Sequence, residues 1–504
     1  MYRWGEDGIA GISDNMQRIC FAVTLWNGKD PILKERLFGL SGKKGNHGED
    51  VKELYYYLDN NPSHSYMNHL YKYPQGEYPY NHLLVSNQNR NRHEPEYELL
   101  DTGLFDNNKY FDVFTEYAKN NEEDICIKIT IHNRANEAAF IAALPTLWLR
   151  NLWSFGAAKH KPAITETEPT EAFGHVKMNH HLLGDYHFYF DAPKRTLFTE
   201  NETNTEKLYN QPNATPFVKD TFDTAVVQNN YEAFKEKNSG TKFSPMYEFD
   251  VEAQYSVTIK LRLSKDVLQN PFDKKFEETF SQRIAETDEF YNSISNTKDE
   301  DEKNIQRQAF ASMLWSKQYF NIDIPRWLNG DPGQPAPPAA RKTGRNHQWM
   351  TLNNEDIISM PDKWEYPWYA AWDLAFHCVP LAMLDATFAK DQLVLFLREW
   401  YMHPNGQMPA YEWALGNVNS PVHAWSCIEV FKIDKKKTGV ADYKFLEKVF
   451  HKLLLNFTWW VNRKDYKGNN IFEGGFLGLD NIGVFDRSSV LPGGGVLEQA
   501  DGTA

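Results

Sequence analysis

The sequence predicts a chain of mixed class, with an antiparallel β-sandwich in its first part and a helical region in its second. Two observations lead to this prediction. Up to about residue 265, apolar residues recur at every second position, which is typical of strands with one buried face. From about residue 273 they recur at helical spacing instead. At 504 residues the chain is also too long for one ordinary core, so two or three domains are expected.

The predicted strands come first along the chain. Over residues 251–263, seven apolar side chains alternate with polar ones, which predicts one long, half-buried strand. The same alternation runs through residues 125–131, and residues 186–190 give a shorter aromatic version. Turns rich in Asn, Asp, Pro and Gly separate these segments, which favours an antiparallel sandwich. The polar stretch 201–212 is predicted to be an exposed loop.

Helical spacing predicts six helices in the rest of the chain. The first is a charged linking helix over residues 274–295, and the others cover residues 305–320, 369–384, 391–402, 422–433 and 443–461. Long loops rich in Gly, Pro and Asn lie between them, and such loops commonly carry function. The predicted domains are a β-sandwich over 1–272, a linking region over 273–300 and a helical domain over 301–504.

Composition disfavours several classes of function. No apolar run approaches the roughly 20 residues that span a bilayer, and the N-terminus shows no secretion signal, so a cytoplasmic protein without a membrane partner is expected. A formal net charge of −14 disfavours nucleic acid as a partner. There is no metal-binding or cofactor-binding motif, so neither group is expected. The four scattered cysteines are predicted to be buried free thiols: Cys20, Cys126, Cys378 and Cys427.

Both ends of the sequence resemble cuts through a larger protein. The chain begins directly with a tryptophan-containing segment and stops at GGGVLEQADGTA, without a closing helix. An internal fragment of a longer polypeptide is therefore expected. Nothing in the sequence predicts the oligomeric state.

One segment, residues 364–425, is enriched in aromatic residues. It holds six of the fifteen tryptophans, and about 21% of its residues are aromatic against 14% for the whole chain. Flat rings cover the C–H faces of a pyranose, polar groups hold its hydroxyls, and a carboxyl group moves the proton during cleavage. The polar residues that suit these roles are Asp373, His377, Gln407, Glu412 and His423. The segment therefore predicts a sugar site.

Each of these residues also has a purely structural interpretation. Asp373 is either a general acid, kept protonated by apolar surroundings, or a buried Asp that caps a helix. His377 lies four residues later on the same helix face, and a hydrogen-bonded core histidine is the favoured interpretation. For Gln407 and Glu412, hydroxyl binding and a role at a helix start are equally favoured. For Trp425, core packing is favoured over sugar binding.

Acidic residues near the end of the sequence are candidates for a second carboxylate. In each case capping of a loop is the favoured role, and the candidates are Asp480, Asp486, Glu498 and Asp501.

The order of a sandwich followed by helices, with WYAAWDLAFH and then GQMPAYEWALGNVNSPVHAW, resembles the family-63 glycoside hydrolases. This family includes processing α-glucosidase I, and the chain looks closest to its long bacterial and fungal relatives. The most specific match is the W-D-x-x-F-H motif that starts at Trp372, and the resemblance extends over essentially all of the chain.

The resemblance implies an N-terminal β-sandwich joined by linking helices to an (α/α)6 barrel, here incomplete, with the active site at its mouth. It also implies that Asp373 is the general acid of an inverting mechanism. The general-base Glu of such enzymes lies near the C-terminal end of the barrel, so it is expected beyond Ala504. Inversion needs two carboxyl groups roughly 6.5–9.5 Å apart, and without the base this polypeptide is expected to be inactive.

The leading hypothesis is an inverting, exo-acting α-glucosidase, or a fragment of one, acting on a glucose-containing oligosaccharide or glucoside. The proposed sugar platform is Trp364, Tyr369, Trp372 and Trp413, and the proposed further contacts are His377, Gln407, Glu412, His423 and Trp425. The second hypothesis is a non-catalytic carbohydrate-binding or structural fragment. The third is a trehalase or phosphorylase on the same barrel, and its only nearby basic cluster in sequence is Arg341, Lys342 and Arg345.

Overall fold

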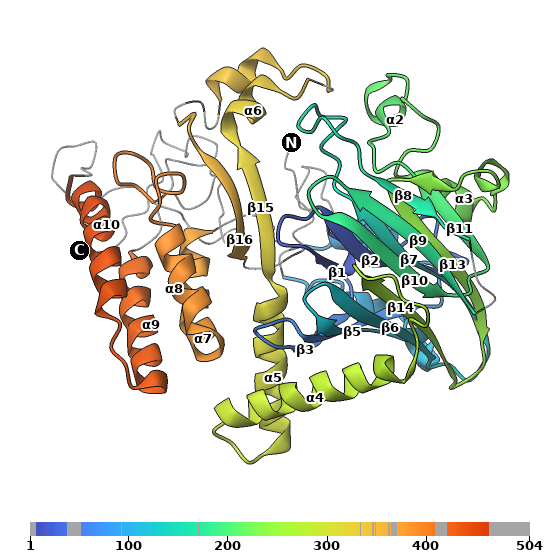
Figure 1. Cartoon of the computed structure of the whole chain (residues 1–504), viewed down its shortest axis with the longest axis horizontal. Coiled ribbons are helices and arrows are strands. Elements are labelled where there is room, and N and C mark those ends of the chain that lie inside the picture. Colours follow the sequence, from blue (N-terminus) through green and yellow to red (C-terminus); the bar gives the residue numbers. More distant parts are fainter. Residues whose placement is uncertain are drawn as a thin grey trace. The chain divides into compact units, whose positions relative to one another are not determined.

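The computed structural model describes residues 7–37, 52–91, 93–168, 172–332, 334–344, 347, 349–360, 363, 370–408 and 421–462. These residues form two compact units (Figure 1). The sheet unit contains most of the chain up to Trp315, together with Pro332–Pro335. The helical unit contains Ser316–Asp331 and the chain from Ala336 onward. The predicted division into 1–272, 273–300 and 301–504 stays a prediction.

Two large antiparallel sheets make up the sheet unit. The five-stranded sheet has the order β1 (Ile9–Ser13), β2 (Ile19–Trp26), β7 (Ala139–Leu149), β13 (Lys242–Val251), β11 (Arg195–Thr199). The nine-stranded sheet has the order β12 (Ser239–Gly240), β8 (Ala163–Glu166), β9 (Phe173–His180), β10 (Gly184–Asp191), β14 (Ser256–Ser264), β6 (Asp124–Asn133), β5 (Tyr110–Asn121), β4 (Tyr66–Pro74), β3 (Tyr55–Asn60).

The two sheets pack face to face through aromatic side chains. Phe21 of the five-stranded sheet lies 5.9 Å, centroid to centroid, from Phe188 of the nine-stranded sheet. Phe190 of the nine-stranded sheet lies 5.3 Å from Phe243 of the other. All four side chains are buried. Gly174 sits opposite Phe190 in the β9–β10 ladder, where a Cβ atom would lie 2.0 Å from the ring, so only glycine fits there.

The predicted strands at residues 125–131 and 186–190 are confirmed as parts of β6 and β10. The single long strand predicted over residues 251–263 is wrong. The chain turns between β13 and β14, Gln254 adopts a φ of 59°, and Tyr255 is 71% exposed. The side chain of Asn133 holds this turn by donating to the carbonyl oxygen of Val251 at 2.8 Å. No Gly or Pro marks the turn, so the alternation continues through it.

Two long helices belong to the sheet unit. α4 (Lys274–Ile294) buries Phe276 and Phe280 against the nine-stranded sheet, and α5 (Glu300–Trp315) packs on β3. The Trp315 indole stacks on the Tyr57 ring at 5.3 Å. Shorter helices lie in the connections: α1 (Tyr80–Asn89), α2 (Thr205–Tyr209), α3 (Thr221–Val227) and the 3-10 turns Leu99–Thr102, Asp106–Asn108 and Glu232–Phe234. The exposed loop predicted over residues 201–212 is wrong for Thr205–Tyr209, which form α2.

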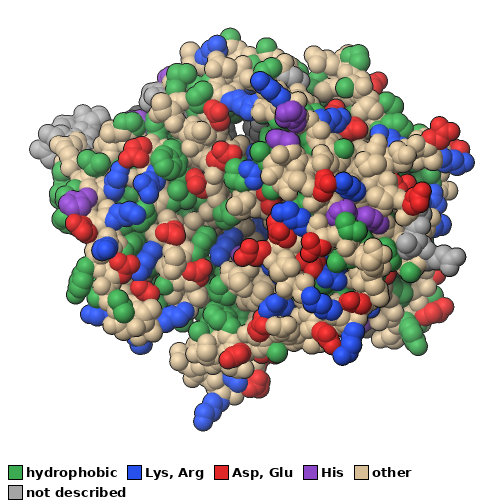
Figure 2. Space-filling view, in the orientation of Figure 1, with side chains coloured by type: hydrophobic (Ala, Val, Ile, Leu, Met, Phe, Trp, Pro, Cys, Tyr) green, Lys and Arg blue, Asp and Glu red, His purple; other side chains and the backbone are tan. Residues whose placement is uncertain are grey.

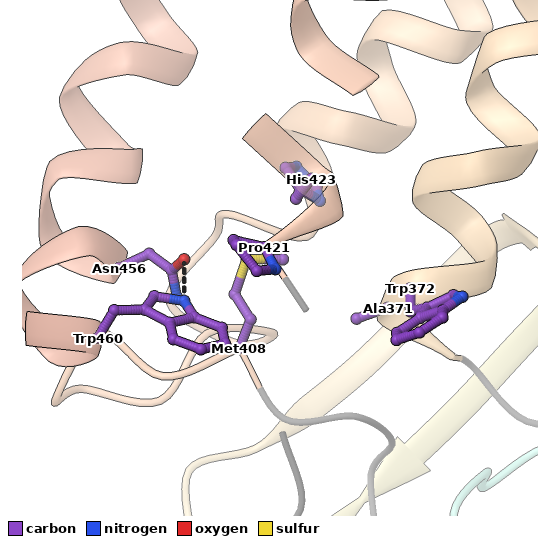
Figure 3. A pocket seen from close by; sticks show the side chains of 7 residues that line it. All are labelled: Ala371, Trp372, Met408, Pro421, His423, Asn456 and Trp460. Atoms are coloured by element: carbon purple, nitrogen blue, oxygen red, sulfur yellow. Dashed lines mark hydrogen bonds between the residues drawn. The ribbon is translucent and has the colours of Figure 1, made fainter. Parts of the chain in front are cut away.

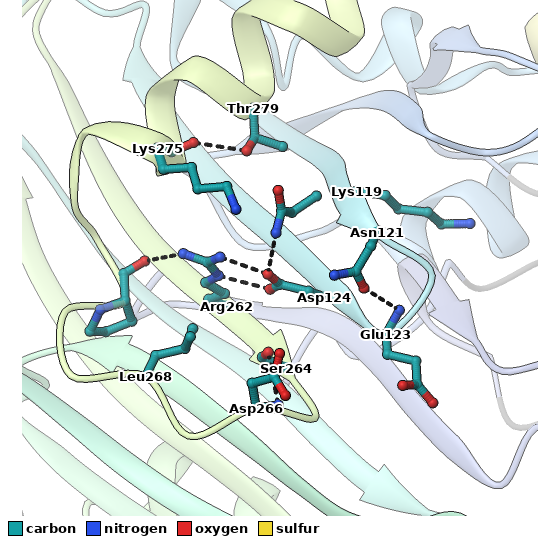
Figure 4. A network of polar contacts seen from close by, with 12 residues as sticks. Lys119, Asn121, Glu123, Asp124, Arg262, Ser264, Asp266, Leu268, Lys275 and Thr279 are labelled. Atoms are coloured by element: carbon teal, nitrogen blue, oxygen red, sulfur yellow. Dashed lines mark hydrogen bonds and ion pairs between the residues drawn. The ribbon is translucent and has the colours of Figure 1, made fainter.

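A buried ion pair joins β6, β14 and the entry to α4 (Figure 4). The Arg262 guanidinium donates to both carboxylate oxygens of Asp124, at 2.8 and 2.6 Å, and to the carbonyl oxygen of Pro271 at 2.9 Å. Asn120 also donates to Asp124 at 2.8 Å. Both charged side chains are about 95% buried, so each depends on the other for its compensation.

The helical unit begins with a two-stranded antiparallel sheet, β15 (Lys317–Asp323) and β16 (Asn353–Ser359). The short helix α6 (Ile324–Asn329) and the 3-10 turn Ala339–Thr343 lie between these strands. Four helices follow among the described residues: α7 (Ala371–Leu384), α8 (Ala386–Leu395), α9 (Val422–Thr438) and α10 (Tyr443–Asn462). None of the helices that the structure describes combines the length and apolarity that crossing a bilayer requires.

The helix predictions are confirmed for α4, α7, α9 and α10, although their ends differ. The helix predicted over residues 305–320 is wrong at its end, because the chain enters strand β15 at Lys317. The helix predicted over 391–402 is also misplaced, since α8 begins at Ala386 and ends at Leu395. The four cysteines are buried and form no disulfide bonds, as predicted.

The buried ion pair generates the first prediction. Asp124→Asn removes the carboxylate charge but keeps the shape, which leaves the Arg262 charge buried without compensation. The free energy of unfolding of the sheet unit should fall by about 3–5 kcal/mol, measured by denaturant titration. As a control, Asp185→Asn breaks the exposed pair with Lys177 in the same sheet and should change stability little. Equal effects of the two substitutions would contradict the structural importance of the buried pair.

Candidate active site

Helix α7 positions the residues at the centre of the predicted site. Its buried residues recur at helical spacing and form one stripe: Ala371, Leu374, Ala375, Cys378, Leu381, Ala382 and Leu384. This stripe packs the helix against α8 and α9. Asp373 and His377 lie beside the stripe and are half-buried, whereas Trp372 and Phe376 face outward. The period of the helix therefore puts a carboxyl group, an imidazole and two aromatic rings on adjoining strips of one surface.

The Asp373 carboxyl group lies in the first turn of α7. A helix N-terminus favours a negative charge, and a hydrogen bond to the residue's own backbone N–H also lowers its pKa. Burial is the larger effect and raises the pKa of Asp373 above its ordinary value of 3.8. The net result favours the protonated acid more than in an exposed Asp.

Ser359, the last residue of strand β16, contacts the His377 ring. A 3.1 Å hydrogen bond joins its Nδ1 to the Ser359 hydroxyl. The backbone N–H of Ser359 in turn donates to the Gln392 side chain of α8 at 3.0 Å. Burial lowers the pKa of His377 to about 4, so the ring is neutral near pH 7. The favoured interpretation of a hydrogen-bonded histidine agrees with these contacts.

Three exposed aromatic rings form a cluster on α7 and α9. The Phe376 ring lies 6.0 Å from that of Trp372 in an edge-to-face arrangement and 5.7 Å from that of Trp425. The core-packing interpretation of Trp425 is wrong, because its side chain is 48% exposed. Trp425 lies in the first turn of α9, which begins at Val422, on the side of the helix away from the buried His423, Ser426 and Cys427.

A small pocket lies at the first turns of α7 and α9 and near the end of α10 (Figure 3). It is lined by Ala371, Trp372, Met408, Pro421, His423, Asn456 and Trp460. Two of the predicted site residues, Trp372 and His423, therefore come together here. Asp373 follows Trp372 in the chain but does not line the pocket. Among the lining residues that the structure describes, His423 is the only one with a titratable acidic or basic side chain.

Asn456 and Trp460 were not predicted from the sequence as site residues. Asn456 is buried on the inner face of α10, where its Oδ1 accepts a 3.1 Å hydrogen bond from the Trp460 indole, one turn later. Its Nδ2 donates to the carbonyl oxygen of Gly406 at 2.9 Å. The signal that could have identified it is a lone amide within the apolar run LLLNFTWW.

The turn before α9 carries Gln407, which is buried rather than open to the surface. Its backbone N–H donates to the Asn405 side chain at 2.8 Å, and its carbonyl oxygen accepts from His403 at 2.9 Å. Gly406 has a φ of 92°, and a Cβ atom there would lie 2.3 Å from the Leu455 carbonyl oxygen. The turn and α10 are therefore in tight contact, which only glycine allows.

The remaining predicted residues lie outside the described part of the chain. These are Trp364, Tyr369, Glu412, Trp413, the second-carboxylate candidates Asp480, Asp486, Glu498 and Asp501, and Arg345 of the basic cluster. Of that cluster, Arg341 packs over the Trp327 ring at 4.8 Å and donates to its carbonyl oxygen at 2.9 Å, while Lys342 is exposed. Arg341 thus has a structural role within its own loop.

The neutral histidines generate a pH prediction. Burial lowers the pKa of His423 from 6.5 to about 4, so the unfolded chain binds the proton first as the pH falls. This contribution to stability is fully present above pH 6.5 and is lost progressively toward pH 4. Denaturant titrations across this window should show a smaller pH dependence for His423→Gln than for the parent chain. His451→Gln, on the exposed face of α10, should leave the dependence unchanged. An unaltered pH dependence in His423→Gln would contradict the account.

Residues 366–476 match the family model of the "Mannosylglycerate hydrolase MGH1-like glycoside hydrolase domain". The chain is 47% identical over 547 aligned positions to the uncharacterized protein YMR196W of Saccharomyces cerevisiae. That alignment covers all of this chain and 50% of the yeast protein, so the chain spans about half the length of this curated relative.

Among solved structures, a putative kojibiose phosphorylase from the human microbiome is similar at 12% identity, over 73% of this chain and 45% of its own. Its TM-score is 0.19, which does not establish a shared fold. The segment that carries Asp373, the aromatic cluster and the pocket is therefore similar to a glycoside hydrolase domain, and it follows two large antiparallel sheets in the sequence.

Proposed function

We propose that the chain is part of an inverting, exo-acting α-glucosidase of the family-63 type. This part contains the β-sandwich and the general acid. Asp373 is its general acid and protonates the glycosidic oxygen of the leaving group. The observation that carries the proposal is the position of this carboxyl group. It is half-buried at the start of α7, beside the exposed aromatic cluster, and lies within the segment that matches a glycoside hydrolase domain.

Burial supports the acid role because a general acid must hold its proton near neutral pH. The raised pKa of Asp373 goes in this direction. The outward-facing rings of Trp372, Phe376 and Trp425 supply flat apolar surface of the kind that stacks on a pyranose. Trp364, Tyr369 and Trp413 extend this platform in the proposal, and His377, Gln407, Glu412 and His423 hold sugar hydroxyls.

The proposal includes an (α/α)6 barrel of which this chain supplies only a part. The general base is one of the late carboxylates, Asp480, Asp486, Glu498 or Asp501, or a residue beyond Ala504. The chain spans half of its yeast relative, which is compatible with a general base that lies beyond Ala504. The activity of the 504-residue chain by itself is therefore expected to be lower than that of a longer form.

An uncharged substrate is favoured over the one named in the matching family model. Mannosylglycerate carries a carboxylate. The described residues that line the pocket beside Trp372 include no lysine or arginine, and the histidine among them is neutral. The net charge of −14 also disfavours an anionic substrate. On the face shown in Figure 2, acidic and basic side chains are interspersed, so no basic patch there compensates for it.

Asp373→Asn provides the test. The substitution keeps the size and a hydrogen-bonding group but removes the transferable proton, so turnover should fall about 100- to 10,000-fold while binding is retained. Glucose release is measured from α-linked and β-linked glucose disaccharides, and mannose release is measured from mannosylglycerate. The enzyme forms are this chain and its fusion to the remaining part of the yeast relative. Asp391→Asn, exposed on α8, serves as the matched control and should keep full activity.

Unchanged rates on an α-glucoside in Asp373→Asn would overturn the acid assignment. Cleavage of mannosylglycerate in preference to α-glucosides would overturn the glucosidase assignment but not the hydrolase class. Sugar binding without hydrolysis in both enzyme forms would favour the non-catalytic alternative.

A further inference from the structure

The buried side chain of His423 has one ring nitrogen with a hydrogen-bond partner and one without a partner among the described residues. The side chain is 5% exposed and lines the pocket at the start of α9. Its Nε2 lies 2.8 Å from the carbonyl oxygen of Leu393. Its Nδ1 is also buried, and no residue that the structure describes offers that atom a hydrogen bond.

The hydrogen bond of Nε2 fixes the tautomer of the ring. A carbonyl oxygen only accepts hydrogen bonds, so Nε2 must carry the proton. The ring is neutral because burial lowers its pKa to about 4. Nδ1 therefore presents a lone pair and needs a donor. Buried acceptors without a donor are rare in folded proteins, which indicates that a group outside the polypeptide completes this one.

The second polar group of the pocket is Asn456. A primary amide has two N–H groups and an oxygen that accepts twice, and Asn456 uses one of each on Gly406 and Trp460. One donor and one acceptor position remain. These two bonds hold the amide in a single orientation, and the close contact between Gly406 and Leu455 fixes α10 against the turn. The amide is thus oriented before any ligand arrives.

Size and charge restrict what the pocket accepts. Its volume is about 20 Å³, which suits one water-sized group. An anionic oxygen would face the Nδ1 lone pair, and an ammonium group would find no carboxylate among the described lining residues. A hydroxyl group suits Nδ1, because its O–H donates to that atom while its oxygen can still accept a hydrogen bond. The Trp372 indole lines the same pocket, so the carbon skeleton that bears the hydroxyl has an aromatic neighbour.

We propose that the pocket formed by His423, Asn456, Trp372 and Trp460 binds a single hydroxyl group of an uncharged sugar, with His423 Nδ1 as the acceptor. The sugar class rests on the proposed function. The assignment of Asn456 and Trp460, and the direction of the hydrogen bond at His423, follow from the geometry of the pocket. The site distinguishes a sugar that carries this hydroxyl from one that lacks it.

The test uses D-glucose and its 2-, 3-, 4- and 6-deoxy derivatives as probes on the 504-residue chain. Binding is followed by tryptophan fluorescence, since two tryptophans line the pocket. One deoxy sugar should bind about tenfold more weakly than glucose to the parent chain. Glucose and that deoxy sugar should bind equally to His423→Phe, because the acceptor is gone. His451→Phe, on the exposed face of α10, should keep the tenfold difference.

A second measurement does not depend on the folding of a variant. In the parent chain labelled with ¹⁵N-histidine, saturating glucose should shift the Nδ1 resonance of His423, and the critical deoxy sugar should not. Two results would overturn the proposal. One is a deoxy-sugar profile that is the same in the parent chain and His423→Phe. The other is the absence of any glucose-dependent change at His423 Nδ1, as expected if only a water molecule fills the pocket.

Failure of this inference is distinguishable from failure of the proposed function. If turnover depends on Asp373 but the deoxy-sugar profile does not depend on His423, the hydroxyl subsite is overturned and the hydrolase function is retained. Binding that depends on His423, without hydrolysis in the extended fusion, supports the subsite and overturns the hydrolase.

Discussion

The packing of α7 against α8 and α9 is the constraint on which the candidate site depends. One apolar stripe of α7 must be buried, and that requirement fixes the rotation of the helix about its axis. Once the rotation is fixed, Asp373 and His377 lie at the edge of the buried stripe and Trp372 and Phe376 lie outside it. The same contact places the start of α9, with His423 inside and Trp425 outside, beside the start of α7. A single packing requirement thus brings the acid, the rings and the buried imidazole into one neighbourhood.

Burial acts on the titratable groups of this neighbourhood in one direction. It raises the pKa of Asp373 and lowers those of His377 and His423, so each group is driven toward its uncharged form. An uncharged acid can donate a proton, and uncharged imidazoles can accept or donate single hydrogen bonds without attracting anions. The proposed substrate class, an uncharged glucoside, is the one that such a site is suited to bind. The pocket-lining residues that the structure describes carry no Asp, Glu, Lys or Arg.

Local periodicity predicted the elements that bury one face, and it was wrong where a turn or a strand lacked a local signal. The alternation of β6 and the stripe of α7 were readable because they depend only on which face is apolar. The break at Gln254 was not, because a side chain far away in sequence, Asn133, stabilises that turn. The same limit applies to the site. Trp372 and His423 were predicted from composition, but Asn456 and Trp460 reach the pocket through the packing of α10, which no local pattern specifies.

The configuration of the sugar first released tests the central claim most directly. If Asp373 is the acid of an inverting mechanism, water attacks the face of the sugar opposite to the bond that breaks. The enzyme for this measurement is the fusion protein that joins this chain to the remaining part of the yeast relative. Proton NMR spectra of an α-glucoside, recorded within minutes of adding this enzyme, should show β-glucose before mutarotation. The Asp373→Asn form should produce no early signal. First release of α-glucose would mean a retaining mechanism with a nucleophilic carboxylate, and it would contradict this account.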